Sequence, residues 1–303
     1  MNTPSTASPS HTAARLPRRE FLRRAAIAGA EALVAPRAFA ALPKTAITRV
    51  RFFRPPSLNQ HFNQSDMVVT VETDSGLTGI GEGGAKDTLT QCAERLIGRN
   101  PFDTERCWQD MYHAWFYPPG REKAHALGAL DLALWDLKGK ALGAPVYDLL
   151  GGAARNHIAC YATGMPRTGT LKDRARAAMA AGFRAFRMNA ADVPAGTSTF
   201  DARAAVRQLA REAREVREVR ESVGPDGDWI VDFHQRFDFA DALRGCKAIE
   251  EFAPLFVEDP VRMEAFFDDI PRLRAMTSAP LAAGEQWGVR WEFHRLIEQG
   301  AID

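Results

Sequence analysis

The strongest constraint on the fold is a series of three short apolar runs between Trp229 and Glu285, each followed by an acid. The acids are Asp232, Glu258 and Glu285, which lie 26 and 27 residues apart. Each run is too short for a helix and precedes a helix-like segment, a rhythm typical of a parallel α/β sheet or barrel. Because parallel strands end at the same edge, we expect the three carboxylates to converge where barrel enzymes carry out their chemistry.

Three converging carboxylates would repel one another unless a cation compensates their charge. A site made only of oxygen ligands suits a hard divalent ion, and the sequence therefore predicts a Mg²⁺ site on Asp232, Glu258 and Glu285. The alternative for each acid alone is that it caps a helix or pairs with an arginine. The regular spacing of all three favours the metal.

Length and composition narrow the class of protein. The 303 residues suit one large barrel-type domain or two domains, and 46% apolar with 25% charged residues is typical of a globular protein. A net charge of +1 gives no reason to expect a nucleic-acid partner or an anionic membrane surface. The four cysteines form no CxxC pair, so we interpret them as packing residues.

Residues 1–40 have the composition of an export signal. Arg18 and Arg19 are followed by Phe21 and Leu22, an Ala-rich stretch, and small residues suited to cleavage. This pattern is typical of a Tat signal and predicts a periplasmic protein. The Ala-rich stretch is too short to span a membrane stably. The alternative is a basic amphipathic tail on a cytoplasmic protein, which Glu31 favours.

Residues 44–152 are expected to form a separate α+β domain. Alternating strand patterns at 46–53 and 66–73 precede a hairpin turn at 74–79, and helical patterns follow at 88–97, 102–117 and 124–142. The small residues Gly128 and Ala129 would let the third helix lie close to a neighbour. Gly143-Ala144-Pro145 is expected to end that helix.

Residues 125–140 of this third helix, the closing Leu149-Leu150-Gly151-Gly152 and the three spaced acids together resemble the enolase superfamily. The resemblance is to its mandelate racemase and muconate lactonizing branch. It implies that the domain at 44–152 caps a modified TIM barrel at 153–303, with loops 55–66 and 81–87 shaping the substrate pocket.

The predicted fold class is α/β, an α+β capping domain followed by an incomplete (β/α) barrel. Barrel strands are expected at 157–161, 183–189, 229–234, 254–260 and 280–285, with helices at 171–181, 201–223 and 239–252. Ala301-Ile302-Asp303 resembles the start of strand six, so strands six to eight are expected to be missing through C-terminal truncation. In the relatives, a histidine on strand seven, supported by an aspartate on strand six, is the base. We therefore expect the base beyond residue 303 and the isolated chain to lack activity.

Strand two ends in Arg187-Met188-Asn189 where many relatives have Lys-x-Lys with a lysine base. An amide such as Asn189 cannot accept a proton at neutral pH. Arg187 either holds a substrate carboxylate through a bidentate pair or forms a salt bridge with a barrel acid.

His234 follows Asp232 by two residues, and in an extended strand both side chains would point the same way. An imidazole there could protonate a leaving hydroxide. The alternative is a histidine that caps the next helix or binds at the domain interface. Asp232-x-His234 together with Asn189 resembles the galactonate dehydratase-like acid-sugar dehydratases.

This resemblance implies an enzyme, a Mg²⁺-dependent lyase that converts an aldonate to a 2-keto-3-deoxy acid through an enediolate. His234 would be the catalytic acid, and Arg187 and Asn189 would bind the small carboxylate substrate. The alternatives are a racemase or cycloisomerase of the same superfamily, or a non-catalytic exported ligand-binding remnant. Relatives commonly assemble as octamers or dimers, so a full-length protein is expected to be a homo-oligomer.

Overall fold

The computed structural model describes residues 42–54, 67–117, 120–163, 168–189, 214–262 and 268–303. The chain divides into the units Met1–Lys44 and Thr45–Asp303, and every element described below lies in the second. The predicted export signal, the predicted loop at 55–66 and residues 201–213 of a predicted helix lie outside the described residues. Within these ranges, no helix combines the length and the apolar character that crossing a membrane requires.

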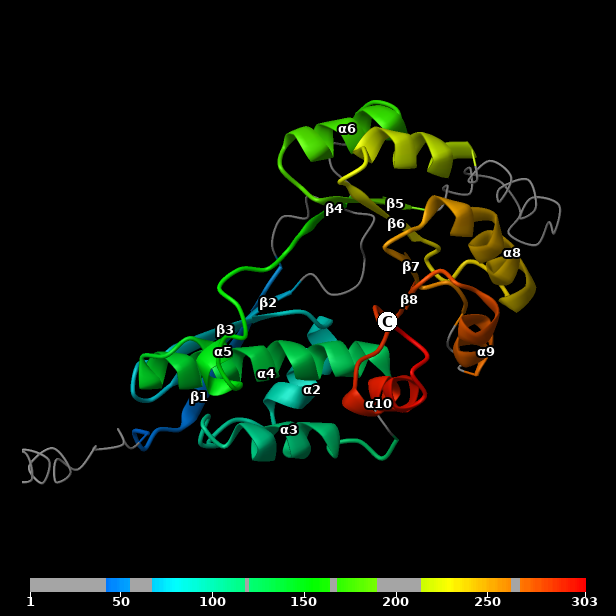
Figure 1. Ribbon diagram of the computed structural model, residues 1–303. Coiled ribbons are helices and arrows are strands. Elements are labelled where there is room, and N and C mark those ends of the chain that lie inside the picture. Colours follow the sequence, from blue (N-terminus) through cyan, green and yellow to red (C-terminus); the bar gives the residue numbers. More distant parts are fainter. Residues whose placement is uncertain (1–41, 55–66, 118–119, 164–167, 190–213, 263–267) are drawn as a thin grey trace, which may run out of the picture. The chain divides into compact units, whose positions relative to one another are not determined.

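A three-stranded antiparallel sheet opens the second unit, in the order β1 (Ile47–Phe53), β2 (Val68–Thr73) and β3 (Thr78–Glu82) (Figure 1). Alternate residues of β2 are buried, as expected for a strand with one face on the core. The turn between β2 and β3 uses Gly76 at φ +84°, a left-handed conformation that favours glycine. The predicted strands and hairpin are confirmed.

The helices α2 (Lys86–Ala93), α3 (Thr104–Tyr112), α4 (Arg121–Leu142) and α5 (Val146–Leu149) follow this sheet. Helix α4 packs against β3, and its backbone approaches so closely that a Cβ on Gly79 would lie 2.0 Å from the Ala133 carbonyl oxygen. The prediction for Gly128 was wrong, because that residue is exposed and a Cβ there would meet nothing within 4 Å. The close approach depends on glycines of the strand, while Ala129 and Ala133 are buried on the helix. Gly143, at φ +63°, ends α4 as predicted.

Five parallel strands form the second sheet in chain order, β4 (Tyr161–Thr163), β5 (Ala185–Asn189), β6 (Asp228–Asp232), β7 (Phe256–Glu258) and β8 (Leu281–Ala282). The helices after these strands are α6 (Leu171–Ala180), α8 (Phe239–Ile249) with the 3-10 turn Glu250–Phe252, α9 (Asp269–Met276) and α10 (Arg290–Glu298), and residues 214–223 between β5 and β6 are also helical. The predicted α/β class, an antiparallel capping sheet and a partial parallel barrel sheet, is confirmed.

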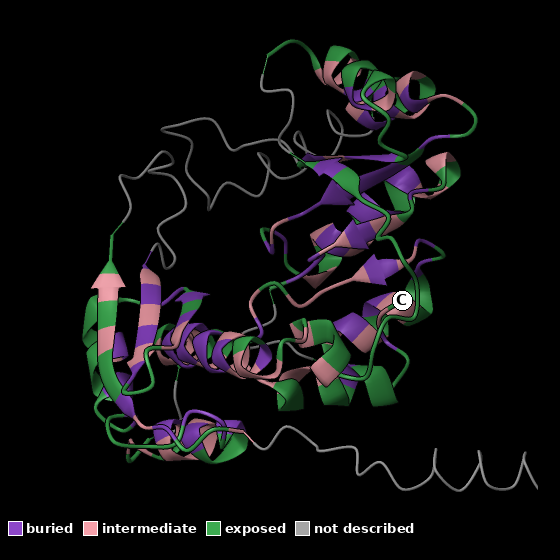
Figure 2. Cartoon of the chain, turned by 90° about the vertical axis from the view of Figure 1, so that its left-hand side faces the viewer, coloured by how far each residue is buried: buried purple, intermediate pink, exposed green. Residues whose placement is uncertain are grey.

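The core of this sheet is formed by buried strand residues and the helix faces that cover them (Figure 2). Trp229, Phe186, Met188 and Val231 are fully buried. Trp229 donates its indole N–H to the Phe252 carbonyl oxygen at 2.8 Å, so the polar group of this large side chain is satisfied inside the core. Thr170 and Asp238 accept backbone N–H groups at the starts of α6 and α8.

The predicted strand boundaries differ from the observed ones in two ways. The first parallel strand is Tyr161–Thr163 rather than 157–161, because Tyr161 already pairs with the first residue of β5 and earlier residues have no ladder partner. Strands β6, β7 and β8 end at Asp232, Glu258 and Ala282, earlier than predicted. At the end of the chain, Asp303 N–H donates to the Leu281 carbonyl oxygen at 2.9 Å, so residue 303 lies beside β8.

Candidate active site at the carboxyl edge

The carboxyl ends of β5, β6 and β7 bring Asn189, Asp232 and Glu258 into one row. Asn189 is the register partner of Asp232, and Asp232 is the register partner of Glu258. Neighbouring strands lie about 4.8 Å apart, so the two carboxylates are adjacent. Asp232 is completely buried, and it therefore requires partners for its charge.

Arg187 supplies that partner from two residues before the end of β5. Its guanidinium donates to Asp232 through Nη2, to Glu258 Oε2 through Nε at 2.6 Å, and to Thr163 Oγ1 through Nη1 at 2.6 Å. One side chain thus connects the ends of three other strands. The predicted salt bridge to a barrel acid is confirmed, while a contact of Arg187 or Asn189 with a substrate stays a prediction.

The charges of Arg187, Asp232 and Glu258 shift the pKa values of Arg187 and Glu258. Burial by itself would lower the pKa of the Arg187 guanidinium, but the carboxylates of Asp232 and Glu258 raise it. Burial raises the pKa of Glu258, with Arg187 opposing this shift and Asp232 adding to it. The excess of negative charge is therefore only partly compensated by the one guanidinium.

His234 reaches Asp232 by a route that differs from the predicted one. Strand β6 ends at Asp232, and His234 and Gln235 adopt left-handed conformations with φ of 50° and 56°. The prediction that His234 continues an extended strand was wrong. The turn instead folds His234 back, so that Asp232 accepts the His234 backbone N–H and the imidazole Nε2–H, each at 2.7 Å. The Nδ1 atom is buried and has no hydrogen-bond partner.

Glu285 lies in the turn after β8 and is exposed. Its charge contributes to raising the pKa of both Tyr161 and Asp259, and burial is the largest cause in each case. Across the residues that the structure describes, no three His, Cys, Asp or Glu side chains are grouped closely enough to hold a metal ion. The donor chemistry fits Mg²⁺ nevertheless, since the adjacent carboxylates of Asp232 and Glu258 are hard oxygen ligands and the charge of Glu285 reaches the neighbouring Asp259. The ligand set Asp232, Glu258 and Glu285 stays a prediction.

Asp259 is a residue of this site that the sequence did not single out. Its side chain is 1% exposed and accepts hydrogen bonds from Gln235 Nε2 at 3.1 Å and from Gly284 N–H at 3.3 Å. Burial raises the pKa of Asp259, and the Gln235 hydrogen bond opposes this shift. Asp259 therefore ties the turn that carries His234 to the turn that carries Glu285. The sequence gives no separate indication of this role, because Asp259 directly follows Glu258, the acid already expected at the end of this strand.

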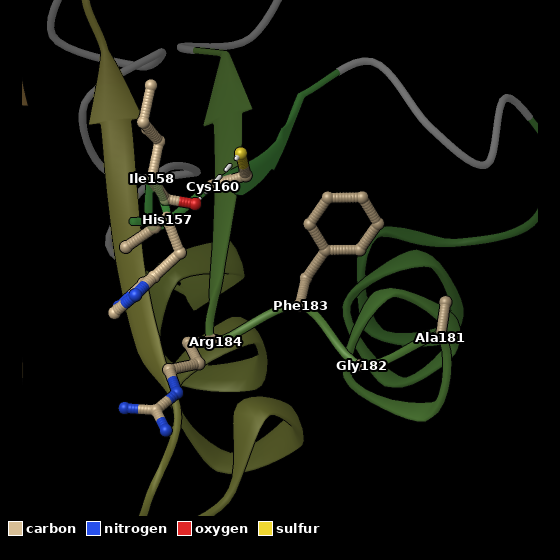
Figure 3. Close-up of a pocket in the computed structure, with 8 residues that line it drawn as sticks. His157, Ile158, Cys160, Ala181, Gly182, Phe183 and Arg184 are labelled. Carbon is tan, nitrogen blue, oxygen red and sulfur yellow. Dashed lines mark hydrogen bonds between the residues drawn. The ribbon is translucent and has the colours of Figure 1, made fainter. Parts of the chain in front are cut away.

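A cavity of about 410 Å³ lies at the opposite end of the strands (Figure 3). It is lined by residues 157–160, which precede β4, and by residues 181–184, which precede β5. Parallel α/β proteins bind substrates at the carboxyl ends of their strands. We therefore assign the candidate site to the row of Asp232 and Glu258.

The parallel sheet, its acidic carboxyl edge and the antiparallel capping sheet define an α/β fold of the barrel type. Residues 46–151 match the family model described as "Mandelate racemase / muconate lactonizing enzyme, N-terminal domain". Residues 170–303 match the model "Enolase C-terminal domain-like". The chain belongs to the mandelate racemase and muconate lactonizing branch of the enolase superfamily, as its motifs predicted.

Individual relatives point to dehydratases. The chain is 38% identical to a D-galactonate dehydratase of Xanthomonas oryzae pv. oryzae over 78% of its own length and 62% of the relative's. It is 36% identical to a D-galactonate dehydratase of Variovorax paradoxus, with the same coverage. The chain thus spans 62% of the length of these relatives.

Solved structures give the same relationship. A putative dehydratase from Salmonella is 27% identical, with a TM-score of 0.76 over 86% of this chain and 73% of that one. The 3,6-anhydro-D-galactonate cycloisomerase of Zobellia galactanivorans is 25% identical, with a TM-score of 0.68 over 85% of this chain and 70% of that one. The chain is therefore related both to dehydratases and to a cycloisomerase of the superfamily.

Proposed function

We propose that this site belongs to a Mg²⁺-dependent hydro-lyase that dehydrates a sugar acid to a 2-keto-3-deoxy acid. The observation that carries the proposal is the imidazole of His234, held 2.7 Å from Asp232 at the carboxyl edge. The similarity to D-galactonate dehydratases supports an aldonate as the substrate. Strand β5 presents Arg187 and Asn189, neither of which can act as a base at neutral pH, so a racemase that uses a base on this strand is disfavoured.

Asp232, Glu258 and Glu285 would hold the metal ion. When bound, Mg²⁺ would supply electrostatic stabilisation of negative charge on the substrate carboxylate. In the proposed reaction, a general base takes the α-proton, and the electron pair of that C–H bond forms the carbon–carbon double bond of an enol as the β C–O bond breaks. His234 Nε2 gives its proton to the departing oxygen, so that water leaves, and the enol becomes the 2-keto acid. Because Nε2 now donates to Asp232, this hydrogen bond must be exchanged for one to the substrate. Asn189 can donate to or accept from a substrate hydroxyl with its amide.

Binding tests the proposal without requiring turnover. We would measure the affinity for D-galactonate by calorimetry, in Mg²⁺ and in EDTA, and compare it with the analogue that lacks the β-hydroxyl. The expected result is Mg²⁺-dependent binding, with a preference of about fivefold for the hydroxylated acid, since one hydrogen bond contributes about 1 kcal/mol.

The variants His234→Ala and His294→Ala complete the binding experiment. His294 is exposed on α10 and serves as the matched control. The fivefold preference should disappear in His234→Ala and persist in His294→Ala. Aldonate binding that is equal in Mg²⁺ and EDTA, or an unchanged preference in His234→Ala, would contradict the proposal. Interconversion of stereoisomers without keto-acid formation would indicate a racemase instead.

We further propose that residues 1–40 export the folded protein to the periplasm and that the protein acts as a homo-oligomer. Replacing Arg18 and Arg19 with lysine in a reporter fusion should abolish export. Light scattering of the purified protein would test its oligomeric state, and a monomeric mass would contradict the second part.

A further inference from the structure

The Arg187 guanidinium donates hydrogen bonds to three side chains at the candidate site, two of which are carboxylates. Its three guanidinium nitrogens donate to Glu258, Thr163 and Asp232, and its side chain is 13% exposed. These partners lie on β7, β4 and β6, while Arg187 itself lies on β5. A planar, permanently charged fork is well suited to hold several acceptors in fixed positions.

The oxygens of Asp232 are already engaged. Oδ1 accepts the His234 backbone N–H, while Oδ2 accepts both His234 Nε2 and Arg187 Nη2. A carboxylate offers about four lone-pair positions in all, so an ion that binds Oδ2 must displace one of its two present donors. Arg187 also engages Oε2 of Glu258, the second proposed ligand.

We propose that Arg187 and the metal ion are alternative partners of the Asp232–Glu258 pair. The guanidinium acts as an internal counter-cation that holds the strand ends together, and binding of Mg²⁺ requires it to release these carboxylates. Thr163, which does not carry a charge, remains as its anchor at the end of β4. This inference rests on the proposed metal, and Arg187 is here a positioning residue rather than a catalytic one.

Charge and desolvation support this exchange. Two adjacent carboxylates, one of them completely buried, would repel each other strongly without a cation between them. A guanidinium and a divalent ion at the same oxygens would repel each other, so simultaneous occupancy is unfavourable. Removing the guanidinium should therefore destabilise the metal-free protein and make the site bind Mg²⁺ more tightly.

The test measures Mg²⁺ affinity by calorimetry and thermal stability in EDTA and in Mg²⁺ for the full chain. The variant is Arg187→Gln, and the control is Arg184→Gln, an exposed arginine that immediately precedes β5. We expect Arg187→Gln to bind Mg²⁺ about tenfold more tightly than the wild type, which corresponds to about 1.4 kcal/mol. Its melting temperature should be several degrees lower in EDTA and should recover in Mg²⁺. Arg184→Gln should match the wild type in both measurements.

Arg187→Lys covers the case in which Arg187→Gln does not fold. A lysine keeps the charge but cannot bridge two carboxylates through one planar group. The Arg187→Lys variant should therefore bind Mg²⁺ more tightly than the wild type and less tightly than Arg187→Gln. Equal or weaker Mg²⁺ affinity in both Arg187 variants would overturn the inference. If neither the wild type nor any variant binds Mg²⁺, the Mg²⁺ site of the proposed function is refuted, and so is the competition between Mg²⁺ and Arg187. In that event, a loss of stability confined to Arg187→Gln would still support the counter-cation role.

Discussion

Replacing Asp259 with alanine should loosen the turns on both sides of the candidate site. The carboxylate accepts hydrogen bonds from Gln235 Nε2 and Gly284 N–H, and alanine would leave both donors without this acceptor. An unsatisfied buried polar group costs about 1–3 kcal/mol, and the longer bond to Gly284 belongs at the low end of that range. Asp259 has φ 44°, a left-handed conformation that alanine tolerates less well than aspartate. Relief of carboxylate burial offsets part of the loss, so we expect Asp259→Ala to lower the free energy of unfolding by about 2–4 kcal/mol.

Urea titration followed by tryptophan fluorescence measures this change, since the chain has six tryptophans. Asp259→Asn keeps the shape, one acceptor oxygen and the tolerance of a left-handed φ, so its loss should be about 1 kcal/mol. Asp226→Ala, in an exposed turn, is the control and should lie within about 0.5 kcal/mol of the wild type. A loss below about 0.5 kcal/mol in Asp259→Ala would refute the proposed link between the turns. Weakened Mg²⁺ binding in the alanine variant alone would show that the link also positions the ligands.

Three further substitutions test the capping domain. Burial raises the pKa of Asp131 from 3.8 to about 6, with the charge of Glu105 adding to the shift. The contribution of the neutral, buried carboxyl to the stability of the protein is complete below pH 3.8, and this contribution is lost as the pH rises through about 6. In a series of melting temperatures measured across this pH window, Asp131→Asn should therefore show a smaller change than the wild type. Gly79→Ala would place a Cβ 2.0 Å from the Ala133 carbonyl oxygen and should lower the unfolding free energy by more than about 2 kcal/mol in urea titration. Gly128→Ala, in the open face of α4, should raise it by about 0.5–1 kcal/mol, and equal effects of the two glycine substitutions would contradict the packing described here.

The sequence predicted most elements of the fold because local patterns reflect burial and turn chemistry. The helix predicted at 239–252 is observed as α8 and the following 3-10 turn, and α4 ends at Gly143 as expected. Errors arose where the outcome depended on a neighbour in space. The strand predicted at 157–161 shifted because its ladder partner begins only at Ala185, and Gly128 was misjudged because the close contact of α4 is made by glycines on β3.

The sequence alone determined the parallel rhythm of strands and helices, the family, and the acids at strand ends, since these follow from composition and spacing along the chain. Only the tertiary structure decided how those acids are paired. It placed Arg187 between Asp232 and Glu258, turned His234 back through a left-handed turn, and buried Asp259 between two turns. Each of these contacts joins residues from different strands or turns. Their distances depend on register and on turn conformation, which spacing along the chain does not specify.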